Sequence, residues 1–230
     1  MGKQKYICIS MGIIFSISLM AVLFLTSIEL IAFNKNFYIG QYEKNQTGDI
    51  IGANEEELSY ITDEMLAYLK DKRQDFDIKW SEGGNIFNER EIEHMKDVKV
   101  LFMNGFKIRN ILALIALALF VVIILIYPRT WPRYMPLSYI WTLTATVAFV
   151  GLMALFMYKD FDRIWDKFHH IFFTNDLWLL DPDTDVMIMM MPSNFFFSLI
   201  LNVIKVFCAG AGSLLIASIY LYKESIKRNI

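Results

Sequence analysis

All three histidines of the chain lie in two short polar segments, each next to a long apolar run. His94 belongs to residues 88–99, and His169 and His170 belong to residues 168–178. An imidazole has an ordinary pKa of about 6.5, so it can accept and return a proton near neutral pH. Hydropathy places both segments at one face of a membrane. We therefore predict that they meet there and that two histidines serve as base and acid.

Other polar side chains accompany each histidine. Asn88 followed by Glu91 is a capping-box pattern, which predicts a helix that begins there and carries His94. On this helix Arg90, His94 and Asp97 recur at three- and four-residue spacing, so their side chains can touch one another. In the second segment the histidines are followed by further polar and aromatic candidates: Asn175, Asp176 and Trp178.

The composition is that of a membrane protein. Of 230 residues, 56% are hydrophobic, 15% are aromatic and only 20% are charged, which is too apolar for a soluble domain of this size. The formal net charge of -2 gives no basic stripe for a nucleic acid. Cys8 and Cys208 both fall inside apolar runs, so we expect two buried thiols and neither a disulfide nor a cysteine metal site.

Four apolar runs are long enough to cross a hydrocarbon core of about 30 Å as helices. We therefore predict an all-α polytopic membrane protein with a mostly helical extracytoplasmic domain between the first two spans and a shorter interfacial outer segment between the last two. The predicted parts are residues 1–33 (cytoplasmic N-terminus and first span), 34–107 (extracytoplasmic domain), 108–158 (second and third spans), 159–194 (outer segment) and 195–230 (fourth span and cytoplasmic C-terminus).

Within the outer regions the pattern predicts two more helices. Asn54 followed by Glu57 opens an amphipathic helix that ends near Lys72, and residues 75–80 then alternate like a short strand or extended segment. Residues 160–173 place aromatic and charged side chains on opposite faces, as in a helix lying in the membrane interface. A histidine on that helix would sit near lipid ester carbonyls.

The polar segments between and after the spans predict the orientation of the chain in the membrane. Residues 128–136 contain three prolines and are expected to form a stiff, tight connector between the second and third spans. Arg129 and Arg133 in this connector, together with the basic C-terminal residues, place both termini in the cytoplasm by the positive-inside rule. His94 and His169 then face outwards.

Metal chemistry fits these residues poorly. The run of Asp181, Asp183 and Asp185 resembles a calcium loop, but Val186 stands where an EF-hand loop needs glycine. A zinc site at the paired histidines and Asp176 lacks the helical spacing of known zinc motifs. We expect no metal and no cofactor. The structural alternative also stays open, because histidines at an interface often only bind headgroups or cap loops.

Both histidine segments resemble one known family, the bacterial lipoprotein intramolecular transacylase family, Lit. The resemblance extends to the four spans and the large first outer loop, and thus to essentially the whole chain. It implies an integral membrane enzyme of Gram-positive bacteria, in the cell membrane, with catalytic histidines at His94 and His169 and a variable residue at His170. The matching motifs are Arg90-Glu91-Ile92-x-His94-Met95-x-Asp97-Val98-Lys99-x-Leu101-Phe102 and Phe168-His169-x-Ile171-Phe172-Phe173-x-Asn175-Asp176-x-Trp178.

In such a family the substrate is a diacylglyceryl lipoprotein within the membrane lipid. The sn-2 acyl chain moves to the α-amino group of the same lipidated cysteine and leaves the lyso form, so no external acyl donor is needed. Because the nucleophile and the ester belong to one molecule, the site has mainly to fold that molecule for attack. We expect Asp97 or Asp176 to orient a histidine, and Arg90, Asn175 or Trp178 to stabilise the developing oxyanion.

A non-enzymatic alternative belongs to another class of protein. The chain could be a membrane accessory or sensory subunit whose extracytoplasmic domain binds a partner. Few charged residues, among them Glu29 and Lys205, fall inside the apolar runs, which argues against a solute pathway of its own.

Overall fold

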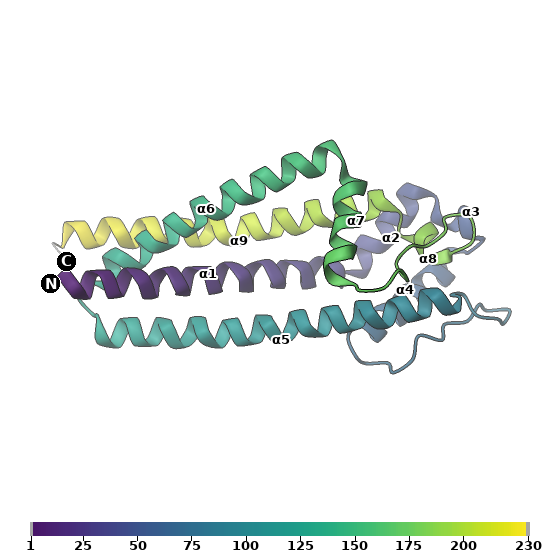
Figure 1. Ribbon diagram of the computed structural model, residues 1–230, viewed down its shortest axis with the longest axis horizontal. Coiled ribbons are helices and arrows are strands. Elements are labelled where there is room, and N and C mark those ends of the chain that lie inside the picture. The colour runs from purple at the N-terminus through teal and green to yellow at the C-terminus, as the bar shows by residue number, and fades with distance from the viewer. Residues whose placement is uncertain (1, 229–230) are drawn as a thin grey trace. The chain divides into compact units, whose positions relative to one another are not determined.

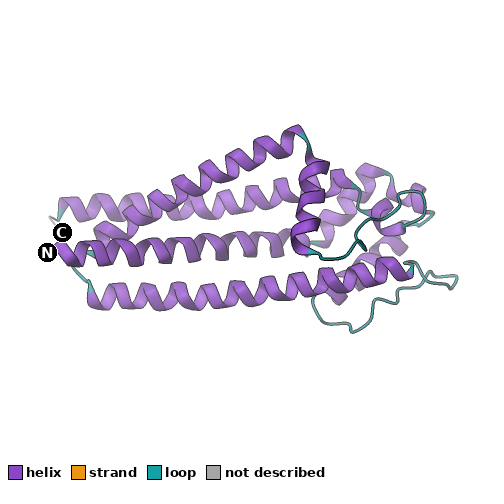
Figure 2. Ribbon diagram, in the orientation of Figure 1, coloured by secondary structure: helices purple, strands orange, loops and turns teal. Residues whose placement is uncertain are grey.

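A computed structural model of the protein describes residues 2–228, and within that range the regular structure is helical (Figure 2). The all-α prediction is therefore confirmed for the described residues. The helices are α1 (Gly2–Ala32), α2 (Lys35–Asn45), α3 (Thr47–Ile51), α4 (Glu55–Leu69), α5 (Glu89–Ile126), α6 (Trp131–Lys159), α7 (Phe161–Phe172), α8 (Val186–Met190) and α9 (Ser193–Lys227).

Four of these helices are long and apolar enough to cross a membrane, namely α1, α5, α6 and α9. Between 6% and 28% of their most apolar stretches is buried within the protein. Most of their apolar surface therefore faces outwards, where lipid tails can cover it. The protein is a multi-pass membrane protein with the four predicted spans.

The chain forms two compact units. The first unit contains residues up to Ile28, Phe106–Lys159 and residues from Asn202 onwards. In this unit α1, α5, α6 and α9 run side by side (Figure 1). The Tyr139 hydroxyl of α6 donates a hydrogen bond to the Ala211 carbonyl of α9, 2.8 Å away. Such interhelical bonds satisfy polar groups that lipid cannot.

One close approach of backbones in the first unit occurs at Gly12 of α1. A Cβ atom there would lie 2.8 Å from the Ser138 hydroxyl of α6, closer than side-chain atoms pack. The same hydroxyl lies 3.3 Å from the Ile9 carbonyl of α1. Glycine therefore lets α1 and α6 come together at this point.

The second unit contains Glu29–Gly105 and Asp160–Leu201 and has its own hydrophobic core. The core is rich in aromatic and methionine side chains from α2, α4, the segment between α4 and α5, the first half of α5, α8 and the start of α9. Phe76 and Phe87, for example, stack with ring centroids 4.9 Å apart. A core of this kind can hold polar side chains at its surface in defined positions.

Both predicted capping boxes are present. Asn54 and Glu57 exchange side-chain and backbone hydrogen bonds at the start of α4. Asn88 and Glu91 do the same at the start of α5. Of the two alternatives predicted for residues 75–80, the structure has the extended segment and not the strand, with an isolated bridge between Lys79 and Asn85.

One expectation about secondary structure was wrong, and two short helices were missed. The proline-rich connector is shorter than predicted, because α6 already begins at Trp131 and contains Pro136. Pro132 lies in the first turn, where its missing N–H would have no partner, whereas Pro136 lies inside the helix and leaves the Pro132 carbonyl without its usual N–H donor. The short helices α2 and α3 were not predicted, and they are joined through Gln46 in a left-handed conformation with φ 54°.

Candidate active site

His94 of α5 and His169 of α7 lie in the second unit with their ring centroids 6.2 Å apart. The side chains are 7% and 8% exposed, so both are buried. Phe173 contacts both rings, at 5.3 Å from His94 and 5.7 Å from His169. Two imidazoles from segments far apart in the sequence thus share one largely apolar environment.

The hydrogen bonding of His169 defines its tautomer. Its Nδ1 lies 2.8 Å from the backbone carbonyl of Trp165, one turn earlier on α7. A carbonyl oxygen can only accept, so in the neutral ring the proton is on Nδ1 and the lone pair is on Nε2. Burial lowers the pKa of His169, while the bond to Trp165 and the nearby Asp166 oppose the shift. The ring is therefore suited to accept a proton at Nε2 near neutral pH.

Aromatic rings hold His169 in place. Trp178 stacks on the imidazole with centroids 4.7 Å apart and an angle of 18° between the planes. Trp165 meets the same imidazole edge to face at 4.9 Å. Such contacts restrict the rotation of the histidine side chain.

His94 is held differently. It lies on the face of α5 that also carries Arg90, one turn earlier. The Nδ1 atom of His94 and the Nε atom of Arg90 are both buried, and neither has a hydrogen-bond partner. Buried polar atoms without a partner are uncommon and often mark a functional site. These two atoms can each bind an oxygen or nitrogen atom of a substrate.

The loop after α7 is attached to the His94 face of α5. Asn175 donates a hydrogen bond of 2.8 Å to the carboxylate of Asp97. The indole N–H of Trp178 donates to the Asn175 carbonyl at 3.0 Å. Arg90 donates to the Asp176 carbonyl, and the Arg90 guanidinium lies 3.7 Å from the Asp176 carboxylate. All seven predicted site residues therefore lie in one connected group.

The connections within this group differ from those expected. The carboxylate of Asp97 accepts a hydrogen bond from Asn175, and Arg90 donates to the backbone carbonyl of Asp176, whereas a bond to a histidine was predicted for one of the two carboxylates. These two bonds hold the loop against α5. His170 is exposed and touches the edge of Trp178 with centroids 5.0 Å apart, so it lies outside the buried pair.

Three residues of the site were missed from the sequence. Trp165 was assigned only to an aromatic anchor, although its four-residue spacing from His169 on a helix was a usable signal. Phe173 was part of the motif but was given no role. Glu91 was interpreted only as a helix cap, and nothing local in the sequence indicated its distant partner.

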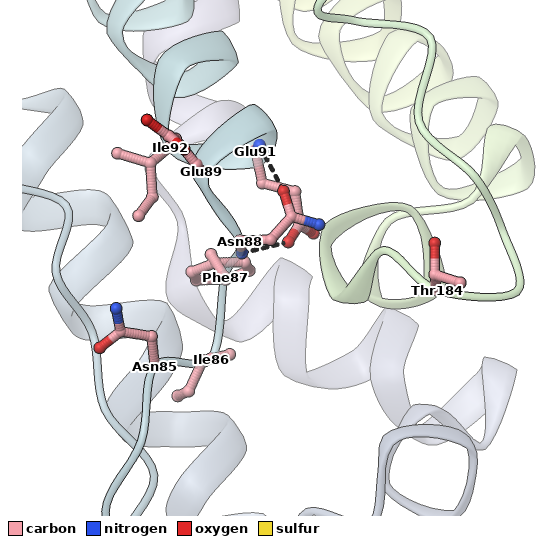
Figure 3. A pocket seen from close by; sticks show the side chains of 8 residues that line it. All are labelled: Asn85, Ile86, Phe87, Asn88, Glu89, Glu91, Ile92 and Thr184. Atoms are coloured by element: carbon pink, nitrogen blue, oxygen red, sulfur yellow. Dashed lines mark hydrogen bonds between the residues drawn. The ribbon is translucent and has the colours of Figure 1, made fainter.

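A cavity of about 480 Å³ lies near the start of α5 (Figure 3). Asn88 and Ile92, which help to line it, lie on a different face of α5 from His94. We therefore do not assign this cavity to the histidine pair. The cavity is lined by Asn85, Ile86, Phe87, Asn88, Glu89, Glu91, Ile92 and Thr184.

In the described part of the chain, no group of three or more His, Cys, Asp and Glu side chains could hold a metal ion.

Fold and site together define an integral membrane protein with a buried pair of imidazoles that can transfer protons. The sequence model of the lipoprotein intramolecular transacylase Lit family matches residues 13–196. The chain belongs to this family, as the resemblance of its motifs predicted. No curated protein matches the chain by sequence.

Three solved structures share the fold. The membrane-integral lipoprotein intramolecular transacylase Lit from Bacillus cereus superimposes with a TM-score of 0.76 at 18% identity, covering 100% of this chain and 99% of that one. A variant of the same protein with a histidine replaced by arginine gives 0.75 at 17% identity, covering 98% and 96%. A histidine-to-alanine variant gives 0.74 at 18% identity, covering 99% and 98%.

Proposed function

We propose that this protein moves the sn-2 acyl chain of a diacylglyceryl-cysteine lipoprotein to the α-amino group of the same cysteine. The amine nitrogen attacks the ester carbonyl carbon, a C–N bond forms, and the bond from that carbon to the glyceryl oxygen breaks. The proton lost by the amine ends on the glyceryl oxygen. The product is the lyso form with an N-acylated cysteine, and no external acyl donor takes part.

One observation carries this proposal: two buried imidazoles, from α5 and α7, lie with centroids 6.2 Å apart. The reaction requires one proton to be removed and one to be returned, and histidine is the side chain best suited to both steps near pH 7. General acid–base catalysis of this kind typically contributes about 10²- to 10⁴-fold to the rate.

We assign different parts to the two histidines. His169 has a free lone pair on Nε2 and acts as the base that takes the amine proton. His94 returns a proton to the departing glyceryl oxygen. Two charged imidazoles so close together in a buried setting would repel each other, so one proton moving between the two groups is the least costly arrangement.

Arg90 is the best of the three predicted oxyanion donors. The side-chain N–H groups of Asn175 and Trp178 already donate to Asp97 and to the Asn175 carbonyl. The Nε–H of Arg90 is buried and has no partner. A donor that is already positioned and not yet engaged can stabilise the charge that develops on the ester oxygen.

We place this reaction at the extracytoplasmic face of the cell membrane, with both termini in the cytoplasm. Arg129, in the short connection between α5 and α6, and Arg133, in the first turn of α6, support that orientation through the positive-inside rule. The exposed apolar side chains of Ile171 and Phe172 on α7 support an interfacial position at which lipid esters are accessible.

The test uses the purified protein and a synthetic diacylated lipopeptide. Transfer within one molecule leaves the mass of the lipopeptide unchanged and blocks its free amine, so the two quantities are measured together. Release of fatty acid with a lighter peptide would show hydrolysis and contradict the proposal. An unmodified amine after prolonged incubation with folded protein would also contradict it.

A further inference from the structure

Glu91 is the most deeply buried carboxylate of the second unit, at 1% exposure. Its two oxygens have different partners. One accepts the backbone N–H of Asn88 at 2.7 Å, and the other accepts the backbone N–H of Met187 at 2.6 Å. Both oxygens act as acceptors; burial raises the pKa of Glu91, and the two backbone N–H groups oppose that shift. A buried carboxyl group without such bonds would destabilise the folded protein.

A second connection runs beside the first. The Asn88 side chain donates a hydrogen bond of 2.8 Å to Asp185, the residue that precedes α8. The other oxygen of Asp185 accepts the Asp181 N–H at 2.8 Å. Figure 3 shows Glu91 and Asn88 joined at the start of α5, with Thr184 on the neighbouring loop. The first turn of α5 therefore holds residues 181–187.

Arg90, the neighbour of Glu91 in the chain, holds a different part of the same segment through the Asp176 carbonyl. Residues 176–187 therefore form a strap whose two ends are attached to consecutive residues of α5. The strap carries Trp178, whose ring stacks on His169 at 4.7 Å. The position of the strap thus bears directly on the orientation of the imidazole.

We propose that Glu91 is a positioning residue for the acyl transfer: by holding Met187 it keeps the strap in place, and through the strap it keeps Trp178 against His169. This inference rests on the proposed function. Glu91 does not touch the reacting atoms, and its effect on the rate is exerted through Trp178.

The geometry explains why a carboxylate stands at this position. A helix cap alone needs only the exchange between Asn88 and Glu91. The second oxygen of Glu91 instead reaches a backbone N–H that is 96 residues away in sequence. No apolar side chain could accept both N–H groups, and both would then be buried without partners.

The experiment compares Glu91→Gln with Glu93→Gln as the matched control. A glutamine has one acceptor oxygen and places its NH₂ against the second N–H group. Glu93 is on the same turn, but its side chain is 45% exposed and it pairs with Lys96. Hydrogen–deuterium exchange over residues 176–187 measures the strap without any reference to activity. Exchange there is expected to rise at least about tenfold in Glu91→Gln, as for loss of a buried bond, and to stay unchanged in Glu93→Gln.

The activity readout separates positioning from general stability. In Glu91→Gln, kcat is expected to fall by about 10- to 100-fold, the effect of a misplacement of about 1 Å, while KM changes little. In a background that carries Trp178→Ala, the same Glu91→Gln change is expected to have almost no further effect on kcat, because both act through one ring. Full additivity of the two changes would overturn the inference.

Thermal unfolding and gel filtration establish that each variant is folded. If Glu91→Gln does not fold, Glu91→Asp replaces it, since aspartate keeps the carboxyl group but is one methylene too short to reach both N–H groups. Unchanged exchange in the strap, or faster exchange with an unchanged kcat, would overturn the inference. If the wild-type protein acylates no amine, the proposed function is lost, whereas the exchange data still decide whether Glu91 holds the strap.

Discussion

The two helices that carry the histidines hold their side chains in different ways. On α5, His94 lies between Glu91 and Met95, which are 1% and 3% exposed, so the hydrophobic core of the second unit holds the helix in place. On α7, Ile171 and Phe172 are 76% and 52% exposed, and His169 depends on neighbouring rings for its position. The first histidine is positioned by its helix and the second by its contacts.

This difference between the two helices supports the assignment of His169 as the base and His94 as the proton donor. His169 has one nitrogen committed to the Trp165 carbonyl, so its other nitrogen is available as a base in a single tautomer. His94 has a buried Nδ1 without a partner, so a substrate atom can complete its hydrogen bonding. A fixed tautomer suits His169 as the base. An unoccupied nitrogen suits His94, which returns the proton to the substrate.

The largest effect on the rate is expected for substitution of the buried histidines His94 and His169, in contrast to the exposed His170. We expect His94→Ala and His169→Ala each to lower the rate of amine acylation by about 10²- to 10⁴-fold, the typical contribution of general acid–base catalysis. His170→Ala should stay within about threefold of wild type, because exposed substitutions rarely matter. The measurement is the initial rate of amine blocking in the lipopeptide.

The double variant sharpens this expectation. Residues that act as a unit are not additive, so His94→Ala with His169→Ala should be hardly slower than either single variant. A rate in His169→Ala equal to that of wild type, with His170→Ala inactive instead, would show that the site had been assigned to the wrong histidine.

A smaller effect should follow from removing the ring that holds His169. Trp178→Ala leaves the imidazole without its stacking partner, and we expect kcat to fall by about 10- to 100-fold through misplacement of the base. Trp178→Phe keeps a ring but loses the N–H bond to Asn175, so it should lose less. Equal loss in both variants would indicate that the hydrogen bond, and not the stack, carries the effect.

The comparison of the two helices also shows what the sequence could and could not predict. The spans and both capping boxes depend on local pattern, and the structure confirms them. The meeting of His94 and His169 followed from placing both at one face. The bond from Asn175 to Asp97 was not predicted, because helix periodicity specifies which residues share a face but not which loop will cover that face. Glu91 and its partner Met187 are 96 residues apart in the sequence, so no local sequence pattern predicts the hydrogen bond between them.

The bond between Asp97 and Asn175 should have a modest effect. Asn175→Ala and Asp97→Ala are each expected to lower the rate by about 2- to 10-fold, as a single hydrogen bond is worth about 0.5–1.5 kcal/mol. In a double-mutant cycle the second change should add little to the first, since both remove the same bond. Additive effects in the cycle would show that Asp97 acts on His94 directly, as the sequence had suggested.

The last prediction concerns the pH dependence of the wild-type rate. Because burial lowers the pKa of His169, its imidazole stays neutral below the ordinary value of about 6.5. The substrate amine, with a pKa of about 7.7–8.0, is then the only group that must lose a proton between about pH 6.5 and 7.5. The logarithm of the rate should therefore rise with a slope of one in that range, with no second inflection from the histidine.

The control for this pH–rate profile is the stability of the folded protein at each pH. Since the folded-state pKa of His169 lies below its unfolded value, the unfolded chain binds more protons as the pH falls, and the protein loses stability below about pH 6.5. Thermal unfolding measured at each pH separates that loss from a change in the chemistry. A slope near two between pH 6.5 and 7.5 in fully folded protein would mean that His169 titrates there as well, and the assignment of the buried, carbonyl-bonded ring as the base would then have to be given up.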